Sequence, residues 1–529
     1  MRHETGIPSP VHFIGVGGAG MSGIAAVLAR LGVAVTGSDL KVSRYTRHLE
    51  EYGVPVCIGH DAAQVGDAAL VVISSAIPLG NPELQEARRR GLPVLQRAEM
   101  LARIMATRRG VAVAGTHGKT TTSSMITHVM LRCERRPTFL VGGDLNDVGS
   151  NAGVGDGEWL VAEADESDGS LLFLRPEVAV VTNVELDHHA NYRCLADVHD
   201  VFRRFAALLP AGGRLVAARG AGADFLAGET QAEITWYGLA GAGRAAGSGT
   251  DAEAGADAGT GAAPKSGAGS SADGGANGHA AAAAARVAGR VAAGAPSPAP
   301  GAADLTAEIE RADDQGSVFV VLRDGERLGR VTLRVPGEHN VLNALAALAA
   351  LAHTGVGFDE AAPQLATFSG AARRYQEIGR HAGVVVIDDY AHHPTEVAAT
   401  LKAARSGSYR RVIAVFQPHL FSRTRYLQRE FGRALTMADE AIVTDIFPAR
   451  EEPEPGVTGK LVVDAYLMER PGGPVFYLPR LADAVRHLRA RVRPGDLVLT
   501  IGAGDVVHVG ERLLASLAEA PSGDAGVGL

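Results

Sequence analysis

The stretch Val111-Ala-Val-Ala-Gly-Thr-His-Gly-Lys-Thr-Thr-Thr122 decides the fold of the middle of this chain. Its first four residues are small and apolar, which predicts a buried strand, and a helix is expected to follow over Thr121–Leu131. Gly115 and Gly118 permit a tight turn between the two. Backbone N–H groups in such a turn converge on a phosphate, Lys119 adds a positive charge, and the Thr120 hydroxyl can hold Mg²⁺. We therefore expect an ATP-binding P-loop, although Val113 replaces the first glycine of the strict pattern.

Composition narrows the class of protein. The 529 residues predict two to four domains, and the net charge of −8 gives no reason to expect a nucleic-acid partner. Three scattered cysteines suit a reducing compartment. The N-terminus lacks an apolar targeting segment, and the sequence has no apolar run long enough to span a membrane. We expect a cytoplasmic enzyme without a membrane partner. Its oligomeric state, monomer or dimer, is left open.

The first segment, residues 1–108, predicts a Rossmann-like domain. A strand over 11–16 leads into a glycine-rich turn and a helix over 21–31, and a second strand ends at Asp39. Glycines at such a turn let a pyrophosphate approach the helix N-terminus, and the acid suits a ribose. The pattern leaves the identity of the ligand open, and a purely structural turn is the alternative. The glycines concerned are Gly15, Gly17, Gly18 and Gly20.

Two further α/β domains are expected, over 109–370 and 371–529, because apolar strands continue to alternate with helical stretches. The whole chain then has three successive domains with mostly parallel sheets: a Rossmann-like N-terminal domain, a central P-loop domain and a Rossmann-like C-terminal domain. Residues 240–303 consist almost entirely of Ala, Gly, Ser, Asp and Pro, which predicts a disordered insert. The strands flanking it, Glu233–Tyr237 and Gly316–Leu322, are expected to pair as a hairpin. The tail 520–529 is also expected to be flexible.

Polar clusters follow several of the predicted strands, where ligands bind in open α/β sheets. Glu163 opens an acidic run that ends at Asp168 and is a candidate Mg²⁺ ligand, although such runs are often merely solvated. His188 follows the next strand and can supply a second metal contact, or it can be structural. Asn340 lies just before an expected helix over 343–351 and could read an adenine edge or cap that helix.

The third domain offers two clusters. Asp388–Glu396 contains Tyr390 and His392, and Phe416–Arg425 contains His419 and Arg423. An arginine guanidinium can bind the carboxylate of a ligand through two hydrogen bonds, although arginines more often pair with an acidic side chain at the surface. Because both clusters end neighbouring strands, we expect a polar pocket there.

Taken together and in this order, six motifs resemble those of the Mur ligases, the ligases of peptidoglycan synthesis, and most closely the branch that joins L-alanine to UDP-N-acetylmuramate. The resemblance spans about residues 10–510 apart from the insert. The motifs are Gly15–Gly23, Gly115–Thr122, Glu163–Asp168, Gly337–Asn343, Asp388–Glu396 and Phe416–His419.

The resemblance implies a role for each site. The N-terminal glycines and Asp39 would hold the UDP end of UDP-N-acetylmuramate, and Tyr390, His392, His419 and Arg423 would serve L-alanine. Lys119, His188 and Glu163 would be catalytic, with Thr120 and Glu163 on one Mg²⁺ and His188 on another. ATP would contact Gly115, Thr116, His117, Gly118, Lys119, Thr120, Thr121 and Asn340.

One absence agrees with this branch. Related ligases place a carbamylated lysine near the second metal, but this chain has no lysine between Lys119 and Lys265. The nearest rival is a ligase that re-attaches a tripeptide to the same UDP-sugar. Other rivals are an NAD-dependent oxidoreductase built on Gly15–Asp39 and a P-loop ATPase that moves a partner.

Overall fold

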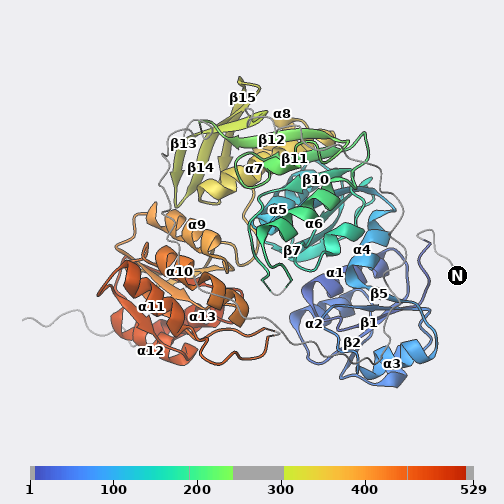
Figure 1. Cartoon of the computed structure of the whole chain (residues 1–529), viewed down its shortest axis with the longest axis horizontal. Helices are drawn as coiled ribbons and strands as arrows, with labels where there is room; N and C mark the ends of the chain where they lie inside the picture. The colour runs from blue at the N-terminus through green and yellow to red at the C-terminus, as the bar shows by residue number, and fades with distance from the viewer. Residues whose placement is uncertain (1–5, 190, 242–302, 450, 520–529) are drawn as a thin grey trace, which may run out of the picture.

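The computed structural model describes residues 6–189, 191–241, 303–449 and 451–519. In this part of the chain the strands form three sheets, of five, ten and six strands (Figure 1). The predicted three-domain α/β fold with mostly parallel sheets is confirmed. The domain limits at residues 108 and 370 stay predictions. Residues 242–302 of the expected insert and the expected tail 520–529 lie outside the described residues.

The N-terminal domain is built on a fully parallel sheet. Its elements are β1 (Val11–Ile14), α1 (Ala19–Arg30), β2 (Val35–Asp39), α2 (Arg44–Glu51), β3 (Val56–Ile58), the 3₁₀ helix η1 (Ala62–Val65), β4 (Leu70–Ile73), α3 (Pro82–Arg89), β5 (Val94–Gln96) and α4 (Arg97–Met105). The strand order is β3-β2-β1-β4-β5, so β1 is central and all four of its residues are buried. The glycine-rich turn therefore leaves the middle of the sheet at its carboxyl end.

The central domain carries the ten-stranded sheet. Its elements are β6 (Arg109–Ala114), α5 (Lys119–Arg132), β7 (Thr138–Leu145), β8 (Ser150–Gly153), β9 (Trp159–Glu163), η2 (Ser170–Phe173), β10 (Val178–Val181), α6 (Leu195–Ala206), β11 (Arg214–Ala218), η3 (Asp224–Leu226), β12 (Glu233–Leu239), β13 (Leu305–Asp313), β14 (Gly316–Arg323), β15 (Glu326–Leu333), α7 (Glu338–His353) and α8 (Phe358–Leu365). Strand β6 lies between β10 and β9, parallel to both. The P-loop and the polar ends of β9 and β10 consequently meet at one edge.

Two expectations about this domain need correction. The helix after the P-loop begins at Lys119, earlier than expected, so Lys119 itself forms the first helical turn. The predicted hairpin is wrong, because β12 pairs in parallel with β13, and β13 in turn pairs antiparallel with β14. Strand β13 directly follows the expected insert, and its Leu305 and Ala307 are buried.

The C-terminal domain has a six-stranded sheet in the order β16-β17-β21-β18-β19-β20, parallel except at β16. Its elements are β16 (Gln376–His381), β17 (Val384–Asp389), α9 (Pro394–Arg405), β18 (Arg411–Phe416), α10 (Phe421–Leu435), β19 (Glu440–Val443), α11 (Lys460–Glu469), β20 (Val475–Tyr477), α12 (Leu481–Arg491), β21 (Asp496–Ile501) and α13 (Val507–Ala518).

The three domains meet around the P-loop edge of the central sheet (Figure 1). Helix α1 packs against the central domain, and one apolar core includes Met21, Leu140 and Ala152. On the opposite side, Thr395 at the start of α9 donates a hydrogen bond to Glu185 at 2.7 Å. The functional motifs of all three domains therefore face a shared region.

Candidate active site

The P-loop adopts the conformation that its glycines predict. Gly115 and Gly118 have φ values of +128° and +80°, which residues other than glycine rarely adopt. A Cβ at Gly118 would lie 2.5 Å from Asn343 Oδ1, so the loop could not pass this residue with any larger side chain. Asn343 therefore packs directly on the loop, a role that sequence reasoning did not assign to it.

Lys119 is largely buried and lies among carboxylates. Its ammonium donates hydrogen bonds to Gly115 O at 2.6 Å, to Thr116 O at 3.1 Å and to Glu166 Oε1 at 3.0 Å. Burial alone would lower the pKa of Lys119, but the charges of Glu166, Asp165 and Glu163 raise it above its ordinary value. The lysine is thus charged at neutral pH and is held at the mouth of the loop.

Glu163 and Thr120 form a second unit beside Lys119. The Thr120 hydroxyl donates to Glu163 Oε2 at 2.9 Å, and burial raises the pKa of Glu163 even though Lys119 lies nearby. Gly142 on β7 faces both side chains, and a Cβ there would collide with the carboxylate of Glu163. The missing side chain lets the β7 backbone lie close to this hydroxyl and this carboxylate.

His188 lies in the segment that follows β10, and its backbone is in the left-handed region with φ +55°. Its Nε2 is 3.4 Å from Glu166 Oε1 and 3.7 Å from Asp187 Oδ2. Glu166 therefore contacts both Lys119 and His188, and these side chains form one cluster at the carboxyl ends of β6, β9 and β10.

Arg423 joins this cluster from the C-terminal domain. Its guanidinium forms a two-pronged ion pair with Asp187, with both N–H···O distances at 3.0 Å, and both side chains are buried. A third N–H donates to His419 Nδ1 at 3.1 Å. The arginine fork thus already binds a protein carboxylate here, and His419 orients it.

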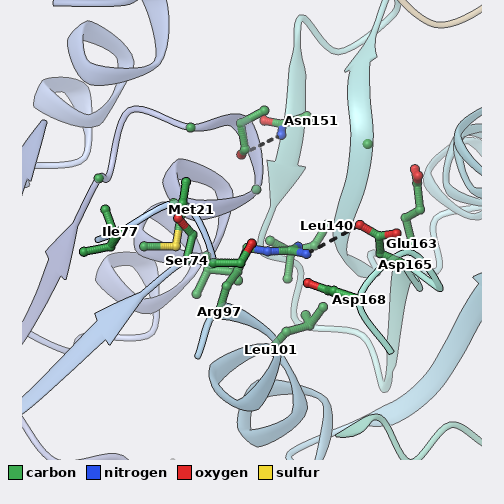
Figure 2. Close-up of a pocket in the computed structure, with 18 of the residues that line it drawn as sticks. Met21, Ser74, Ile77, Arg97, Leu101, Leu140, Asn151, Glu163, Asp165 and Asp168 are labelled. Atoms are coloured by element: carbon green, nitrogen blue, oxygen red, sulfur yellow. Dashed lines mark hydrogen bonds and ion pairs between the residues drawn. The ribbon is translucent and has the colours of Figure 1, made fainter. Parts of the chain in front are cut away.

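A cavity of about 610 Å³ lies between the N-terminal and central domains (Figure 2). The glycine turn, Asp39, Arg97 and the acidic segment after β9 line it. Arg97 reaches across the cavity toward Asp165, at 3.9 Å. A ligand that is anionic at one end would meet Arg97 and the N-terminus of α1.

Gly17 and Gly18 have different roles in this turn. A Cβ at Gly17 would lie 2.8 Å from Asp39 Oδ2, and Gly17 N donates to the same oxygen at 2.8 Å. Gly18, in contrast, lines the cavity, and apart from its chain neighbours the described residues place only Gly15 O, at 3.9 Å, within 4 Å of an added Cβ. Gly17 thus supports the loop from behind, whereas Gly18 faces the ligand space.

Two more cavities continue from the first. One of about 510 Å³ is lined by Lys119, Thr120, His188, Tyr390 and His392, and it shares Gly142, Glu163 and Asp165 with the first. Another of about 260 Å³ is lined by Thr121 and Asn340, and it shares His117 and Gly118 with the second. The three cavities therefore form a chain that passes the P-loop.

Most of the predicted site residues line these cavities or the neighbouring one of about 340 Å³ that contains Arg423. Gly17, Gly115 and His419 do not line any of these four, because each packs behind the wall. Asn340 donates to Pro336 O at 2.7 Å, and its Oδ1 accepts from Asn343. Its side chain is therefore fixed at the cavity wall.

The histidines of the two third-domain clusters, His392 and His419, are neutral at physiological pH. Burial lowers the pKa of His392 to about 4 and that of His419 to about 3. His392 lies 2.9 Å from Tyr390 O and beside Glu396. The pKa of Glu396 is well below its ordinary value, because the nearby His392, His117 and Arg374 offset the effect of its burial.

Sequence reasoning missed several residues that line the cavities. Arg374, which lines two of them, follows the expected domain boundary without a strand end to mark it. His60 follows the short strand β3, and its Nδ1 lies 2.6 Å from Glu83, which is fully buried and also contacts His12. The Arg373-Arg374 pair was a visible signal, whereas the His60–Glu83 contact depends on the tertiary structure.

Fold and site together define a three-domain α/β protein in which a P-loop faces two further domains. Family models agree: the Mur ligase family catalytic domain matches residues 10–109, the Mur ligase middle domain 113–250 and the Mur ligase glutamate ligase domain 373–504. The chain belongs to the Mur ligase family. None of the helices in the described ranges is long and apolar enough to cross a membrane.

Curated relatives are similar over nearly the whole chain. A UDP-N-acetylmuramate–L-alanine ligase of Rubrobacter xylanophilus is 47% identical and covers 96% of this chain and 100% of its own. One of Acidothermus cellulolyticus is 45% identical over 93% and 91%. Among solved structures, a UDP-N-acetylmuramate–alanine ligase from Thermotoga maritima has a TM-score of 0.73 at 24% identity, over 97% and 100%. A murein peptide ligase from Psychrobacter arcticus has a TM-score of 0.65, also at 24% identity, over 97% and 99%.

Proposed function

We propose that this chain catalyses the ATP-dependent ligation of L-alanine to the lactyl carboxylate of UDP-N-acetylmuramate, giving UDP-N-acetylmuramoyl-L-alanine, ADP and phosphate. The reaction belongs to peptidoglycan synthesis and takes place in the cytoplasm. One observation carries the proposal: three joined cavities lead from the glycine turn of the N-terminal domain, past Lys119, to Asn340. The printed names of the curated relatives support the choice of substrates.

The first cavity suits the UDP end of the acid substrate. Backbone N–H groups at the start of α1 face it, and Gly18 leaves room for a diphosphate. Asp39 accepts hydrogen bonds from Gly17 N and Lys41 N, which holds its carboxylate at the end of β2 for a ribose hydroxyl. The sugar and its lactyl carboxylate then extend toward Glu163 and Asp165 in the second cavity.

ATP is proposed to occupy the second and third cavities. Its adenine end lies against Asn340 and Thr121, and its phosphates lie against Thr116, His117, Gly118 and Lys119. Glu166 now neutralises Lys119, so a bound phosphate competes with Glu166 for the same ammonium. The proposal thus gives Lys119 two alternative anionic partners.

Thr120 and Glu163 fit Mg²⁺ through the chemistry of their donors. A hydroxyl and a carboxylate are oxygen ligands of the type that Mg²⁺ takes, and Thr120 and Glu163 both line the second cavity. We propose that Thr120 and Glu163 hold one ion and that His188 contacts another. Bound there, Mg²⁺ would offset the negative charge of the phosphates.

The reaction then follows from simple chemistry. A carboxylate is a poor acyl donor, because its leaving group would be oxide. An oxygen of the lactyl carboxylate attacks the γ-phosphorus, ADP leaves, and an acyl phosphate forms, while the positive charge of Lys119 stabilises the charge that develops. The neutral amine of L-alanine attacks the acyl carbon, loses a proton, and phosphate departs with the carboxylate oxygen.

The C-terminal domain would supply the amine site. Tyr390 and His392 line the phosphate cavity, and the neutral ring of His392 can accept a hydrogen bond from an amine. Arg423 is held by Asp187 and His419 at the edge of the neighbouring cavity. An L-alanine carboxylate would therefore have to share or displace the Asp187 partner.

ADP release by the purified chain tests this function. With ATP and Mg²⁺, we expect release only when UDP-N-acetylmuramate and L-alanine are both present. Glycine, L-serine and the L-alanyl-γ-D-glutamyl-meso-diaminopimelate tripeptide are tested separately as amines. Turnover with the tripeptide alone would establish the re-attaching ligase instead. ADP release without any UDP-sugar would overturn the ligase assignment.

A further inference from the structure

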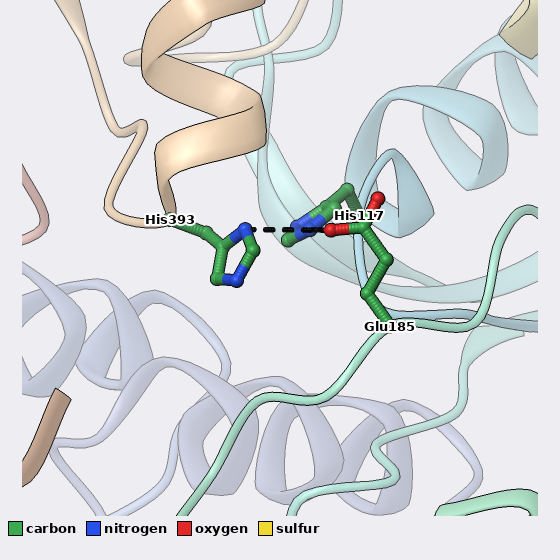
Figure 3. Close-up of side chains that lie close together, drawn as sticks. All are labelled: His117, Glu185 and His393. Atoms are coloured by element: carbon green, nitrogen blue, oxygen red, sulfur yellow. Dashed lines mark hydrogen bonds and ion pairs between the residues drawn. The ribbon is translucent and has the colours of Figure 1, made fainter. Parts of the chain in front are cut away.

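Three side chains converge where the P-loop meets the C-terminal domain (Figure 3). His117 comes from the loop itself, Glu185 from the segment after β10, and His393 from the residue before α9. One ligand atom from each lies within 4.8 Å of the other two. They belong to two different domains, so they meet only when these domains are in contact.

The distances suit a metal ion. Glu185 Oε2 lies 3.3 Å from His117 Nε2 and 3.6 Å from His393 Nδ1. Two ligands bound tetrahedrally at ordinary zinc distances are separated by about 3.4 Å. A modest approach of the two imidazoles would therefore complete three sides of a tetrahedron around an ion.

Hydrogen bonding alone explains the cluster incompletely. His393 Nδ1 accepts a long hydrogen bond of 3.4 Å from Thr395 N, so this nitrogen presents a lone pair. It nevertheless faces a carboxylate oxygen, which is also an acceptor. A cation between the two would remove this unfavourable contact.

Further residues support the three ligands from outside. The Thr395 hydroxyl donates to Glu185 Oε2 at 2.7 Å, and His117 Nδ1 lies 3.5 Å from Glu396 Oε1. A carboxylate behind a histidine fixes the tautomer that offers the other nitrogen to a metal. The cluster thus has both a ligand set and the outer contacts that orient it.

We propose that His117, Glu185 and His393 form a binding site for a divalent transition metal of the zinc, cobalt or nickel class, distinct from the proposed Mg²⁺ sites. Two imidazoles select such ions, whereas Mg²⁺ prefers oxygen ligands. His117 lines both nucleotide cavities and Glu185 lines one, so a fourth position on the ion faces them. The ion would tie the P-loop to the N-terminus of α9. Metal binding by this cluster does not depend on the proposed function.

Co²⁺ provides the test, because four-coordinate Co²⁺ in a protein site absorbs visible light far more strongly than hydrated Co²⁺. The full metal-free chain is titrated with CoCl₂ in the absence of ATP and Mg²⁺. We expect one equivalent to produce an intense visible band that one equivalent of Zn²⁺ removes. If stoichiometric Co²⁺ produces no such band, the proposed metal site is wrong.

Two variants locate the ion. His393→Asn keeps a residue that caps helices well, and His117→Gln keeps an amide near Glu185. Each substitution should weaken Co²⁺ binding at least tenfold. Zn²⁺ should raise the melting temperature of the unmodified chain but not that of either variant, and the melting temperature is measured for every variant. Affinities equal to that of the unmodified chain would overturn the proposal.

Matched controls use the same type of substitution elsewhere. His508→Gln changes a half-exposed histidine on α13, and His188→Gln changes the proposed Mg²⁺ contact. Both should bind Co²⁺ as the unmodified chain does. Loss of the band in His188→Gln alone would place the ion at the Mg²⁺ site and contradict the proposal.

Discussion

At the scale of single residues, Lys119 holds the position on which the proposed chemistry depends most. It is charged, largely buried and paired with Glu166, and the phosphate that it is proposed to bind would replace Glu166 as its partner. Its charge is most valuable where negative charge accumulates in the transition state. An alanine at this position also leaves Glu166 without its cationic partner.

We expect Lys119→Ala to lower kcat by about 10²–10³-fold, the cost of removing one preorganised electrostatic contact. Initial rates of ADP release at saturating substrate measure the effect, and a melting curve shows whether the variant is folded. Near-normal turnover in a folded variant would remove the P-loop assignment.

Gly18 tests the UDP-substrate cavity without disturbing the protein. Because the described part of the chain brings no side chain within 4 Å of the position of its Cβ, Gly18→Val should fold normally. It should raise the KM for UDP-N-acetylmuramate at least tenfold, while the KM for ATP changes little. Gly17→Val serves as the contrast, because its side chain would meet Asp39 and lower the melting temperature. An unchanged KM for the UDP-sugar in Gly18→Val would place the substrate elsewhere.

His188 tests the proposed metal contact. His188→Ala should raise the Mg²⁺ concentration for half-maximal rate, since water would replace the imidazole. His189→Ala is the control, because this neighbouring ring stacks on Tyr426 with centroids 4.6 Å apart. If both variants give the Mg²⁺ titration of the unmodified chain, His188 has only a structural role.

At the scale of elements, apolar runs located most of the strands around the site. Strand β2 ends at Asp39 as the sequence predicts, β6 contains the predicted residues 111–114, and β14 begins at the predicted Gly316. Strand β13 was missed, because it begins immediately after a long stretch of Ala and Gly and alternates buried with exposed residues only weakly. The alternating pattern next to such a stretch covers too few residues to show where the strand begins.

The expected insert can be removed between two described strands. Tyr237 on β12 lies opposite Leu305 on β13, so the ends of the deleted segment are anchored in one sheet. Because β12 and β13 are parallel, the replacement for residues 242–302 has to return along the sheet, which takes a Gly/Ser linker of about a dozen residues. This replacement should leave kcat and both KM values within about twofold, because closing a loop depends only weakly on its length. A tenfold loss of kcat in a folded deletion variant would show that the segment acts on the site.

The site was predictable to the extent that its residues follow strands. Lys119, Glu163, His188 and Tyr390 all do so, and the second cavity collects them. The partners that tune them were not predictable. The Asp187–Arg423 ion pair and the contact between His117 and Glu396 join segments more than 200 residues apart in the sequence, and only the packing of two domains brings them together.

At the scale of the whole molecule, the proposal requires three domains to assemble one reaction path. In this proposal the acid substrate would bind on the N-terminal side, ATP would lie along the P-loop, and the C-terminal domain would supply the amine site. The Asp187–Arg423 ion pair closes the last of these interfaces. An acyl phosphate in such a covered site is protected from water until the amine arrives.

Isotope transfer tests the central claim most directly. UDP-N-acetylmuramate labelled with oxygen-18 in its lactyl carboxylate is converted with ATP and L-alanine, and the released phosphate is analysed by mass spectrometry. The acyl phosphate path predicts that each phosphate carries one carboxylate oxygen, so label appears in phosphate in step with ADP release. Phosphate released at the same rate but without label would contradict the account.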